Sequence, residues 1–117
     1  MQNDDRRMEA CIQQCRECSD ACQDALYNHC LEMGGEHAEA QHVKLMTDCI
    51  QACMAAADFM NRNSPYHGAV CAACAEICES CAESCERIGG EIMERCAEVC
   101  RRCAESCRDL SKMKKAA

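Results

Sequence analysis

The chain has 117 residues, 16 of them cysteine, and a formal net charge of −7 at pH 7. It contains no apolar run long enough to span a membrane, and its polar N-terminus is not followed by the apolar run of a signal peptide. We therefore expect a cytoplasmic protein without a membrane partner. Basic residues are scattered among acidic ones with few aromatic side chains between them, which argues against nucleic-acid binding. The length suits one small domain, and we predict that residues 1–117 form a single unit.

The residues that normally fill a protein core are scarce. Leu, Ile, Val and Phe make up about a tenth of the chain, a proportion that usually indicates disorder when net charge is appreciable. The many alanines and the helical spacing of the cysteines favour a folded chain instead, with sulfur filling its core. A secreted disulfide scaffold is the ordinary explanation for so much cysteine. Such scaffolds are rich in loops, however, and thiols four residues apart on one helix fit disulfide geometry poorly.

Three breaks divide the chain into helical segments. Gly-Gly pairs at 34–35 and 89–90 favour helix ends, and the Asn-Ser-Pro run at 63–65 combines a stop, a capping residue and a proline suited to the first helical position. The segments that remain lie near residues 4–33, 36–62, 66–88 and 91–113. Because the connections are short, neighbouring helices run antiparallel. We therefore predict an all-α, up-down-up-down four-helix bundle with a cysteine-lined interior.

The first segment spaces its cysteines by four, three and four residues. Such steps return side chains to one face of a helix, so these thiols form a single stripe. Its members are Cys11, Cys15, Cys18 and Cys22. Continuing the steps leads through Leu26 to His29 and Met33. Cys30 lies about 100° away from this stripe, which makes it a weaker candidate for the interior.

The second segment has two cysteines, and its stripe reads His42, Met46, Cys49 and Cys53. Imidazole and thioether groups therefore stand where the other segments place thiols, while His37 projects to another face. Val43, Ile50 and Ala57 form a second row, spaced by seven residues. We interpret this row as an outer face that could serve an oligomer interface, or a purely structural interaction module.

The last two segments carry the longest sulfur stripes. The third contains Cys71, Cys74, Cys78, Cys81 and Cys85, with His67 four residues before the first of them. The fourth contains Cys96, Cys100, Cys103 and Cys107, with Met93 before them and Leu110 after them. The pentapeptide Cys-Ala-Glu-Ser-Cys occurs in both, so the two segments are variants of one helix type.

Stripes of thiols that converge on one interior favour a soft metal ion. Buried cysteine can act as a small apolar residue, but that explains one or two per domain rather than 16. Low-coordinate thiolate binding suits Cu(I), whereas a tetrahedral zinc site would have to draw four sulfurs from facing helices. The loop motif of iron–sulfur proteins does not occur. The C-x3-C-x2-C spacing of radical-SAM enzymes does occur, but a helical stripe produces it automatically.

Neutral ligands should gather at the end of the bundle that carries the Gly-Gly turns. They are His29, Met33, His42, Met46 and Met93. Imidazole and thioether bind Cu(I) more weakly than thiolate, so this end could accept an ion and pass it inward. The alternative is that the methionines fill core gaps and the histidines are surface groups. Met8, Met60 and His67 offer the same possibilities at the opposite end, so the sequence leaves open which end admits metal.

The repeated C-x3-C pairs resemble those of the Cys-rich four-helix-bundle copper storage proteins, the Csp family, over residues 4–113. The pairs are Cys11/Cys15, Cys18/Cys22, Cys49/Cys53, Cys74/Cys78, Cys81/Cys85, Cys96/Cys100 and Cys103/Cys107. The resemblance implies that these thiols, with Cys71 extending the third stripe, hold many Cu(I) ions inside the four-helix bundle of each chain, and that four chains assemble as a tetramer. In showing no leader sequence, the chain resembles the cytosolic branch of the family. It departs from the family pattern in its second segment, which has too few cysteines for a fully sulfur-lined interior.

We predict that the chain stores or sequesters Cu(I) and is not an enzyme, because no catalytic constellation stands out. The predicted ligands are the fifteen cysteines other than Cys30, together with His42 and Met46. Weaker candidates are Cys30, His29, Met33, Met93 and His67. Expected partners are copper ions, a copper chaperone or efflux protein, and further copies of the chain. The rival hypothesis is a zinc-buffering or thiol redox protein.

Overall fold

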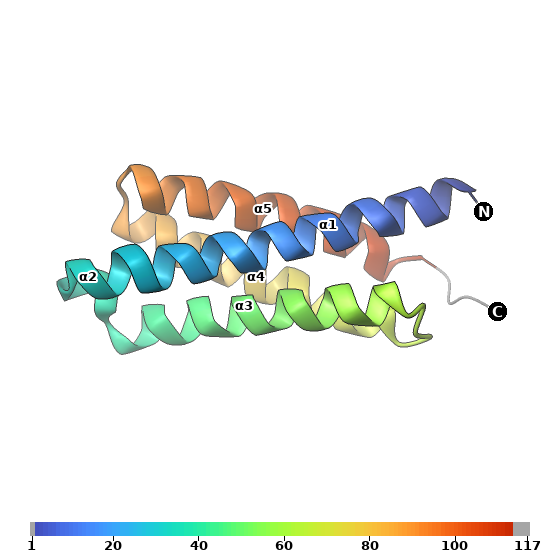
Figure 1. The fold of residues 1–117 in the computed structure, drawn as a ribbon, viewed down its shortest axis with the longest axis horizontal. Helices are drawn as coiled ribbons and strands as arrows, with labels where there is room; N and C mark the ends of the chain where they lie inside the picture. The colour runs from blue at the N-terminus through green and yellow to red at the C-terminus, as the bar shows by residue number, and fades with distance from the viewer. Residues whose placement is uncertain (1, 114–117) are drawn as a thin grey trace.

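Four long helices form an antiparallel bundle in the computed structural model, which describes residues 2–113 and measures 49 × 21 × 19 Å (Figure 1). The long helices are α1 (Gln2–Ala25), α3 (Ala40–Asn61), α4 (His67–Ile88) and α5 (Glu91–Ser111). Between α1 and α3 lie a π-helical turn (Leu26–Cys30), the short α2 (Leu31–Met33) and a 3-10 turn (Gly35–Ala38). The predicted fold class is confirmed, and the predicted segments agree with the helices to within a few residues. Residues 1 and 114–117 of the predicted single unit lie outside the described range.

Glycine pairs make both turns at one end of the bundle. The backbone φ angles of Gly34, Gly35, Gly89 and Gly90 are all positive, at 69°, 55°, 79° and 92°. Side chains other than hydrogen rarely tolerate this conformation, which explains why glycine occupies these positions. The amide of Gly89 also donates to the Cys85 carbonyl at 2.9 Å and so closes the last turn of α4.

The turn at the opposite end differs from the predicted one in its use of proline. Pro65 lies in the turn itself, and α4 begins two residues later, at His67. Asn63 adopts a positive φ of 54°, and Ser64 accepts a hydrogen bond from the Tyr66 amide at 3.1 Å. The polar residues before α4 therefore stabilise a tight turn rather than place proline at the first helical position.

Sulfur and alanine form the middle of the core. Every cysteine is buried, and large side chains fill the two ends instead: Leu26, Met46 and Met93 toward the glycine turns, Met60 and Leu110 toward the other end. Thiol and methyl side chains are small, so the helices approach closely while still burying apolar surface. Among the residues that the structure describes, sulfur is accordingly the one kind of group along the middle of the core that can bind a soft metal, and alanine methyl groups fill the space around it.

The π-helical turn overturns one expectation. In a regular helix Cys30 would lie off the sulfur stripe, yet it is completely buried, whereas Met33 is 60% exposed and His29 is only partly buried. A π turn accommodates an extra residue and so rotates all later positions around the helix axis. The stripe of the first segment therefore continues from Cys22 through Leu26 to Cys30.

The row formed by Val43, Ile50 and Ala57 is not an outer face. Ala57 is fully buried, Ile50 is 9% exposed, and Val43 packs against the core. The Ser19 hydroxyl donates to the Ile50 carbonyl at 3.1 Å, which shows how closely α1 covers this side of α3. The row belongs to the buried side of α3, and its interpretation as an outer face that could serve an oligomer interface was wrong.

Charged side chains occupy the outside of the bundle. Arg101 bridges to Glu86 at 2.7 Å and to Glu79 at 3.4 Å, which ties α5 to α4. Arg16 and Asp58 connect α1 to α3 at 3.4 Å. Exposed pairs of this kind each contribute about 0–1 kcal/mol, so burial of the core rather than surface pairing sustains the fold. Among the helices of residues 2–113, none combines the length and apolar character needed to cross a membrane.

Candidate metal centre

The cysteine stripes of all four long helices meet along the bundle axis. Sulfur atoms from different helices approach to 3.4 Å between Cys15 and Cys107, 3.5 Å between Cys22 and Cys100, and 3.6 Å between Cys53 and Cys78. These separations are contacts between thiols, not disulfide bonds, and all 16 cysteines are free. The interior is thus a continuous array of unbonded thiols.

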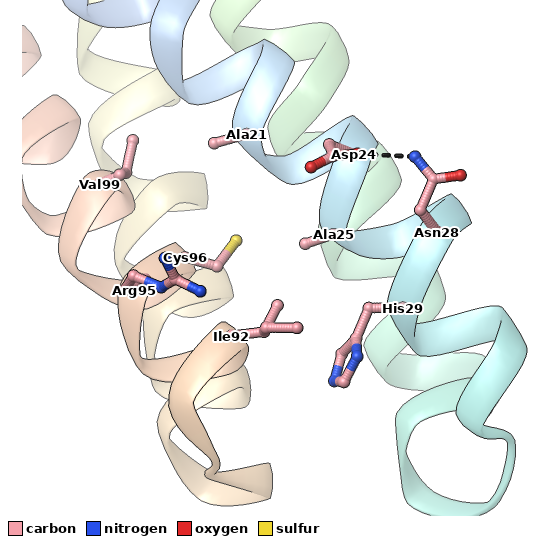
Figure 2. Close-up of a pocket in the computed structure, with 9 residues that line it drawn as sticks. All are labelled: Ala21, Asp24, Ala25, Asn28, His29, Ile92, Arg95, Cys96 and Val99. Atoms are coloured by element: carbon pink, nitrogen blue, oxygen red, sulfur yellow. Dashed lines mark hydrogen bonds between the residues drawn. The ribbon is translucent and has the colours of Figure 1, made fainter.

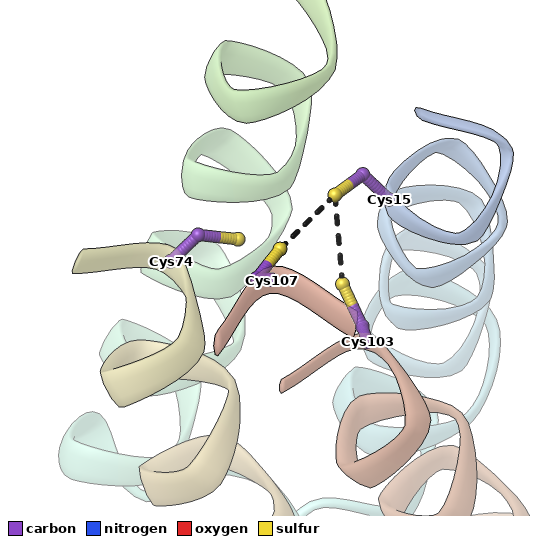
Figure 3. Close-up of side chains that lie close together, drawn as sticks. All are labelled: Cys15, Cys74, Cys103 and Cys107. Atoms are coloured by element: carbon purple, nitrogen blue, oxygen red, sulfur yellow. Dashed lines mark hydrogen bonds between the residues drawn. The ribbon is translucent and has the colours of Figure 1, made fainter. Parts of the chain in front are cut away.

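Three groups of four sulfurs lie close enough to share a metal ion. In each group the sulfur atoms are all within 4.8 Å of one another. The groups are Cys15/Cys74/Cys103/Cys107, Cys18/Cys53/Cys78/Cys103 and Cys18/Cys22/Cys49/Cys100. Figure 3 shows the first, in which side chains from α1, α4 and α5 converge on one point. Each group draws its sulfurs from at least three helices, so the packing of the bundle assembles them.

The three groups are linked through common members. Cys103 belongs to the first and second groups, and Cys18 belongs to the second and third. A thiolate shared between two groups is placed to bridge two metal ions. The arrangement therefore favours a polynuclear thiolate cluster over three separate four-sulfur sites.

The remaining interior cysteines extend this linked set toward both ends. Cys11 lies 3.8 Å from Cys107, and the thiol of Cys71 interacts with both of them. Toward the glycine turns, Cys96 lies 3.7 Å from Cys22, and the thiol of Cys85 interacts with that of Cys96. The thiol of Cys81 interacts with those of Cys100, Cys22, Cys49 and Cys85. The structure thus brings together all fifteen cysteines predicted as principal ligands.

Contacts between thiols set their protonation. Hydrogen bonding with Cys107, and then with Cys15, lowers the pKa of Cys103, whereas hydrogen bonding with Cys103 raises the pKa of Cys107. A thiolate is favoured at one position because neighbouring thiols keep their protons. The metal-free interior can therefore hold only isolated negative charges, and filling it with metal must release protons.

A different set of ligands surrounds Cys30 near the glycine turns. Its sulfur lies 3.5 Å from His42 Nε2, 3.7 Å from Met93 Sδ and 3.9 Å from Met46 Sδ. Burial, reinforced by the nearby Cys96 and Cys22, raises the pKa of Cys30 to about 11. The predicted gathering of His42, Met46 and Met93 is confirmed, but Cys30 joins them in place of His29 and Met33.

His42 is held in this end group by a serine that the sequence did not point to. Its Nδ1 lies 2.8 Å from the hydroxyl of the buried Ser84. Burial lowers the pKa of His42, and the charges of Arg87 and His37 add to the effect. The imidazole is therefore neutral at pH 7, with Nε2 directed at the Cys30 sulfur. A fixed second partner of this kind is typical of metal-binding histidines.

The other candidate histidines occupy different surroundings. The ring of His29 packs edge-on against that of His37, with centroids 5.0 Å apart, outside the interior. His67 is buried at the opposite end of the bundle, and its Nδ1 donates to the Ser64 carbonyl at 3.0 Å. Its Nε2 has no hydrogen-bond partner among the described residues. A neutral His67 therefore keeps its lone pair on Nε2, the form that could bind a metal.

A match to a known family decides what these thiols are for. The family model described as copper storage protein (Csp) matches residues 4–112, which is nearly the whole chain. The chain belongs to the copper storage protein family. A curated relative, the uncharacterized cysteine-rich protein YhjQ of Bacillus subtilis, is 35% identical over 69 residues. That match spans 59% of this chain and 63% of the relative.

Three solved structures, two of them of copper storage proteins, share the fold of this chain. The Nmul_A1745 protein of Nitrosospira multiformis is 45% identical with a TM-score of 0.88, over 92% of this chain and 96% of that one. The Cu(I)-bound copper storage protein BsCsp3 is 34% identical with a TM-score of 0.83, over 90% and 98% of the two chains. The metal-free copper storage protein 3 of Bacillus subtilis gives 35% and 0.79, over 88% and 97%. The resemblance stated from the cysteine pairs is confirmed.

Proposed function

We propose that this chain stores Cu(I) as a thiolate cluster along the axis of its bundle. One observation carries the proposal: three four-sulfur groups are joined by the shared residues Cys18 and Cys103 inside a copper storage fold. A similar bundle, BsCsp3, has been solved with Cu(I) bound. Thiolate is the ligand that soft Cu(I) prefers, and bridging thiolates allow many ions in a small volume.

We propose specific ligands from the geometry of each region. Fifteen cysteines supply the cluster along the axis, and Cys30 binds one further ion with His42, Met46 and Met93. His67 is a terminal ligand candidate near Cys71, because its Nε2 is buried without a partner. Met33 is too exposed to take part.

Zinc buffering is the alternative that the geometry addresses most directly. Facing helices do supply groups of four sulfurs, as tetrahedral zinc requires, so the shape of one group does not by itself exclude zinc. Tetrahedral zinc ions can also share bridging thiolates, so the sharing of Cys18 and Cys103 fits either metal. What favours Cu(I) is the match to the copper storage family and the similar bundle solved with Cu(I) bound. A thiol redox role has no support from the family match.

We further propose the setting in which the protein works. Residues 1–117 act as one non-catalytic storage unit in the cytoplasm, assembled as a homo-oligomer, with tetramers implied by the family resemblance. A copper chaperone or efflux protein exchanges metal with it. Analytical ultracentrifugation of metal-free and loaded protein would test the assembly, and a monomer in both states would contradict it.

Anaerobic titration of the fully reduced protein with Cu(I), against a competing chelator, tests the storage function. We expect about 8–16 tightly bound ions per chain, or half to one per cysteine. Zn(II) in excess should fail to displace them. Saturation at one or two ions would refute the proposal and return zinc or redox chemistry to consideration.

A further inference from the structure

A pocket of about 330 Å³ opens on the side of the bundle between α1 and α5, beside the π-helical turn (Figure 2). Nine residues line it: Ala21, Asp24, Ala25, Asn28, His29, Ile92, Arg95, Cys96 and Val99. In Figure 2 the sulfur of Cys96 points into the space between the two walls. The pocket thus gives access from the surface of the protein to one interior thiol, at a position away from either end of the bundle.

Cys96 connects this pocket to the linked sulfur groups. Its exposed fraction is 4%, whereas each of the other fifteen cysteines is at 0%. On its inner side, its sulfur lies 3.7 Å from that of Cys22, which belongs to one of the four-sulfur groups. A metal ion received by Cys96 would therefore have a second thiol, and then a whole group, within immediate reach.

The acidic residue among the lining residues, Asp24, already accepts a hydrogen bond from Asn28 at 2.6 Å, and the groups beside Cys96 suit an anionic complex of Cu(I). His29 and Ile92 extend toward each other from opposite walls, and Arg95 lies beside them on α5 (Figure 2). Imidazole is a ligand for copper, and the Arg95 guanidinium, paired only at 3.5 Å with the exposed Glu91, can attract a carboxylate. The volume is at the lower end of small-molecule pockets, about 300 Å³.

The π-helical turn helps to form this site. It supplies Asn28 and His29 to the wall, and its extra residue is what turns Cys30 into the core and leaves His29 on the outer side. Such turns are found often at functional sites. Here the same feature builds the buried Cys30 group and the outer wall of the pocket.

We propose that this pocket is a lateral port, in which a small anionic thiol exchanges Cu(I) with Cys96. The inference rests on the proposed storage function. The Cys96 thiol loses its proton and binds the Cu(I) of a two-coordinate thiolate complex, and one donor thiolate departs with that proton. The Cys22 thiol then displaces the second donor thiolate in the same way. Copper stays Cu(I) throughout, so the exchange needs no oxidant or reductant.

Two pocket variants and one matched control test the port. Ala21→Phe fills the pocket, and Ile92→Ala widens it without touching a proposed ligand. Ala72→Phe is the control, because Ala72 lines a similar groove of about 380 Å³ that contains no cysteine. The measurement is anaerobic stopped-flow transfer of Cu(I) from its glutathione complex to metal-free protein, followed by thiolate-to-copper absorbance.

We expect Ala21→Phe to slow transfer at least several-fold, Ile92→Ala to speed it, and Ala72→Phe to leave it unchanged. The number of ions bound at equilibrium should be the same in all three. Wild-type rates in both pocket variants would overturn the port while leaving storage intact. Loss of multi-ion binding in the wild-type chain would instead refute the storage function.

A measurement without copper tests the port independently, even if the filled variant does not fold. Metal-free protein is treated briefly with iodoacetamide, and the modified cysteines are identified by peptide mass spectrometry. We expect Cys96 to be labelled first, and faster in Ile92→Ala. Labelling that begins at Cys30 or Cys71, near the two ends of the bundle, would overturn the proposal.

Discussion

The middle of the bundle and its glycine-turn end bury sulfur in different ways. The middle contains linked groups made only of thiols, whereas the end surrounds one thiol, Cys30, with His42, Met46 and Met93. One Cu(I) on one thiolate with neutral partners is electrically neutral, and so is inexpensive to bury. Two thiolates on one Cu(I) would leave a net negative charge. In the middle, neutrality requires ions and thiolates in nearly equal numbers, which the bridging positions allow.

The largest expected effect concerns the middle of the bundle: binding Cu(I) there should raise the thermal stability of the protein. Each site that binds metal only in the folded state contributes about 2.7 kcal/mol at a hundredfold excess over its dissociation constant. Since about 1 kcal/mol shifts the melting temperature of a small domain by 4–8 °C, saturating Cu(I) should raise it by tens of degrees. Anaerobic calorimetry of the two forms checks this. A melt that Cu(I) leaves unchanged would contradict a cluster that crosslinks all four helices.

Removing the shared thiols should lower capacity more than removing thiols near the ends. The double variant Cys18→Ser, Cys103→Ser breaks all three four-sulfur groups, because each residue belongs to two of them. Cys11→Ser, Cys30→Ser also removes two thiols but leaves those groups intact. Counting bound Cu(I) by anaerobic titration should show a loss of several ions for the first pair and about two for the second.

Equal losses from the two pairs would mean that the shared positions do not bridge ions. Each buried hydroxyl without a full set of partners costs about 1–3 kcal/mol, and this cost applies to both pairs. Circular dichroism of the metal-free variants therefore serves as the control for folding. No further control variant is needed, because each double variant loses two buried thiols and so serves as the control for the other.

The sequence predicts the stripes well because they depend only on the helical repeat. It fails at the π-helical turn, where an inserted residue changes the register and exchanges the places of Cys30 and Met33. One signal was present: Cys22, Leu26 and Cys30 are spaced four and four, a run that drifts off one face of a regular helix but stays aligned through a π turn. A rule based on strict steps of three and four could not use it.

The sequence also could not show which sulfurs meet. The groups depend on how far each helix is shifted along its neighbours, which residue spacing within one helix does not determine. The row at Val43, Ile50 and Ala57 was misread for a related reason: a bundle helix packs against two neighbours, so its buried face is wider than one stripe. Ser84, the partner of His42, carried no signal at all.

The thioethers of the glycine-turn end offer a smaller test. Replacing both Met46 and Met93 with leucine keeps most of the volume and removes two neutral ligands of the Cys30 group. We expect the loss of about one weakly held Cu(I), or its weaker binding, while the cluster in the middle fills normally. Met60→Leu is the control, since Met60 is almost as completely buried at the opposite end. Unchanged binding at every stage of the titration would show that the two methionines only fill space.

The smallest expected effect is the pH dependence of the metal-free fold, which reports on His42. Burial, followed by the charges of Arg87 and His37, lowers the pKa of His42 in the folded state. The unfolded chain therefore binds its proton at a higher pH than the folded chain does. As the pH falls below about 6.5, the unfolded state gains protons first and stability declines, by at most about 1.4 kcal/mol per pH unit for one group.

Urea unfolding of metal-free protein between pH 7.5 and pH 5.5 measures this slope. His42→Gln should flatten it, because the glutamine amide does not titrate. His37→Gln, which removes an imidazole outside the core at the same end, should keep most of it. If the slope survives in His42→Gln, the acid sensitivity arises elsewhere and His42 is not held neutral by burial. If it disappears, a neutral imidazole is maintained beside Cys30 before any metal arrives, which is the form that can bind Cu(I) without first losing a proton.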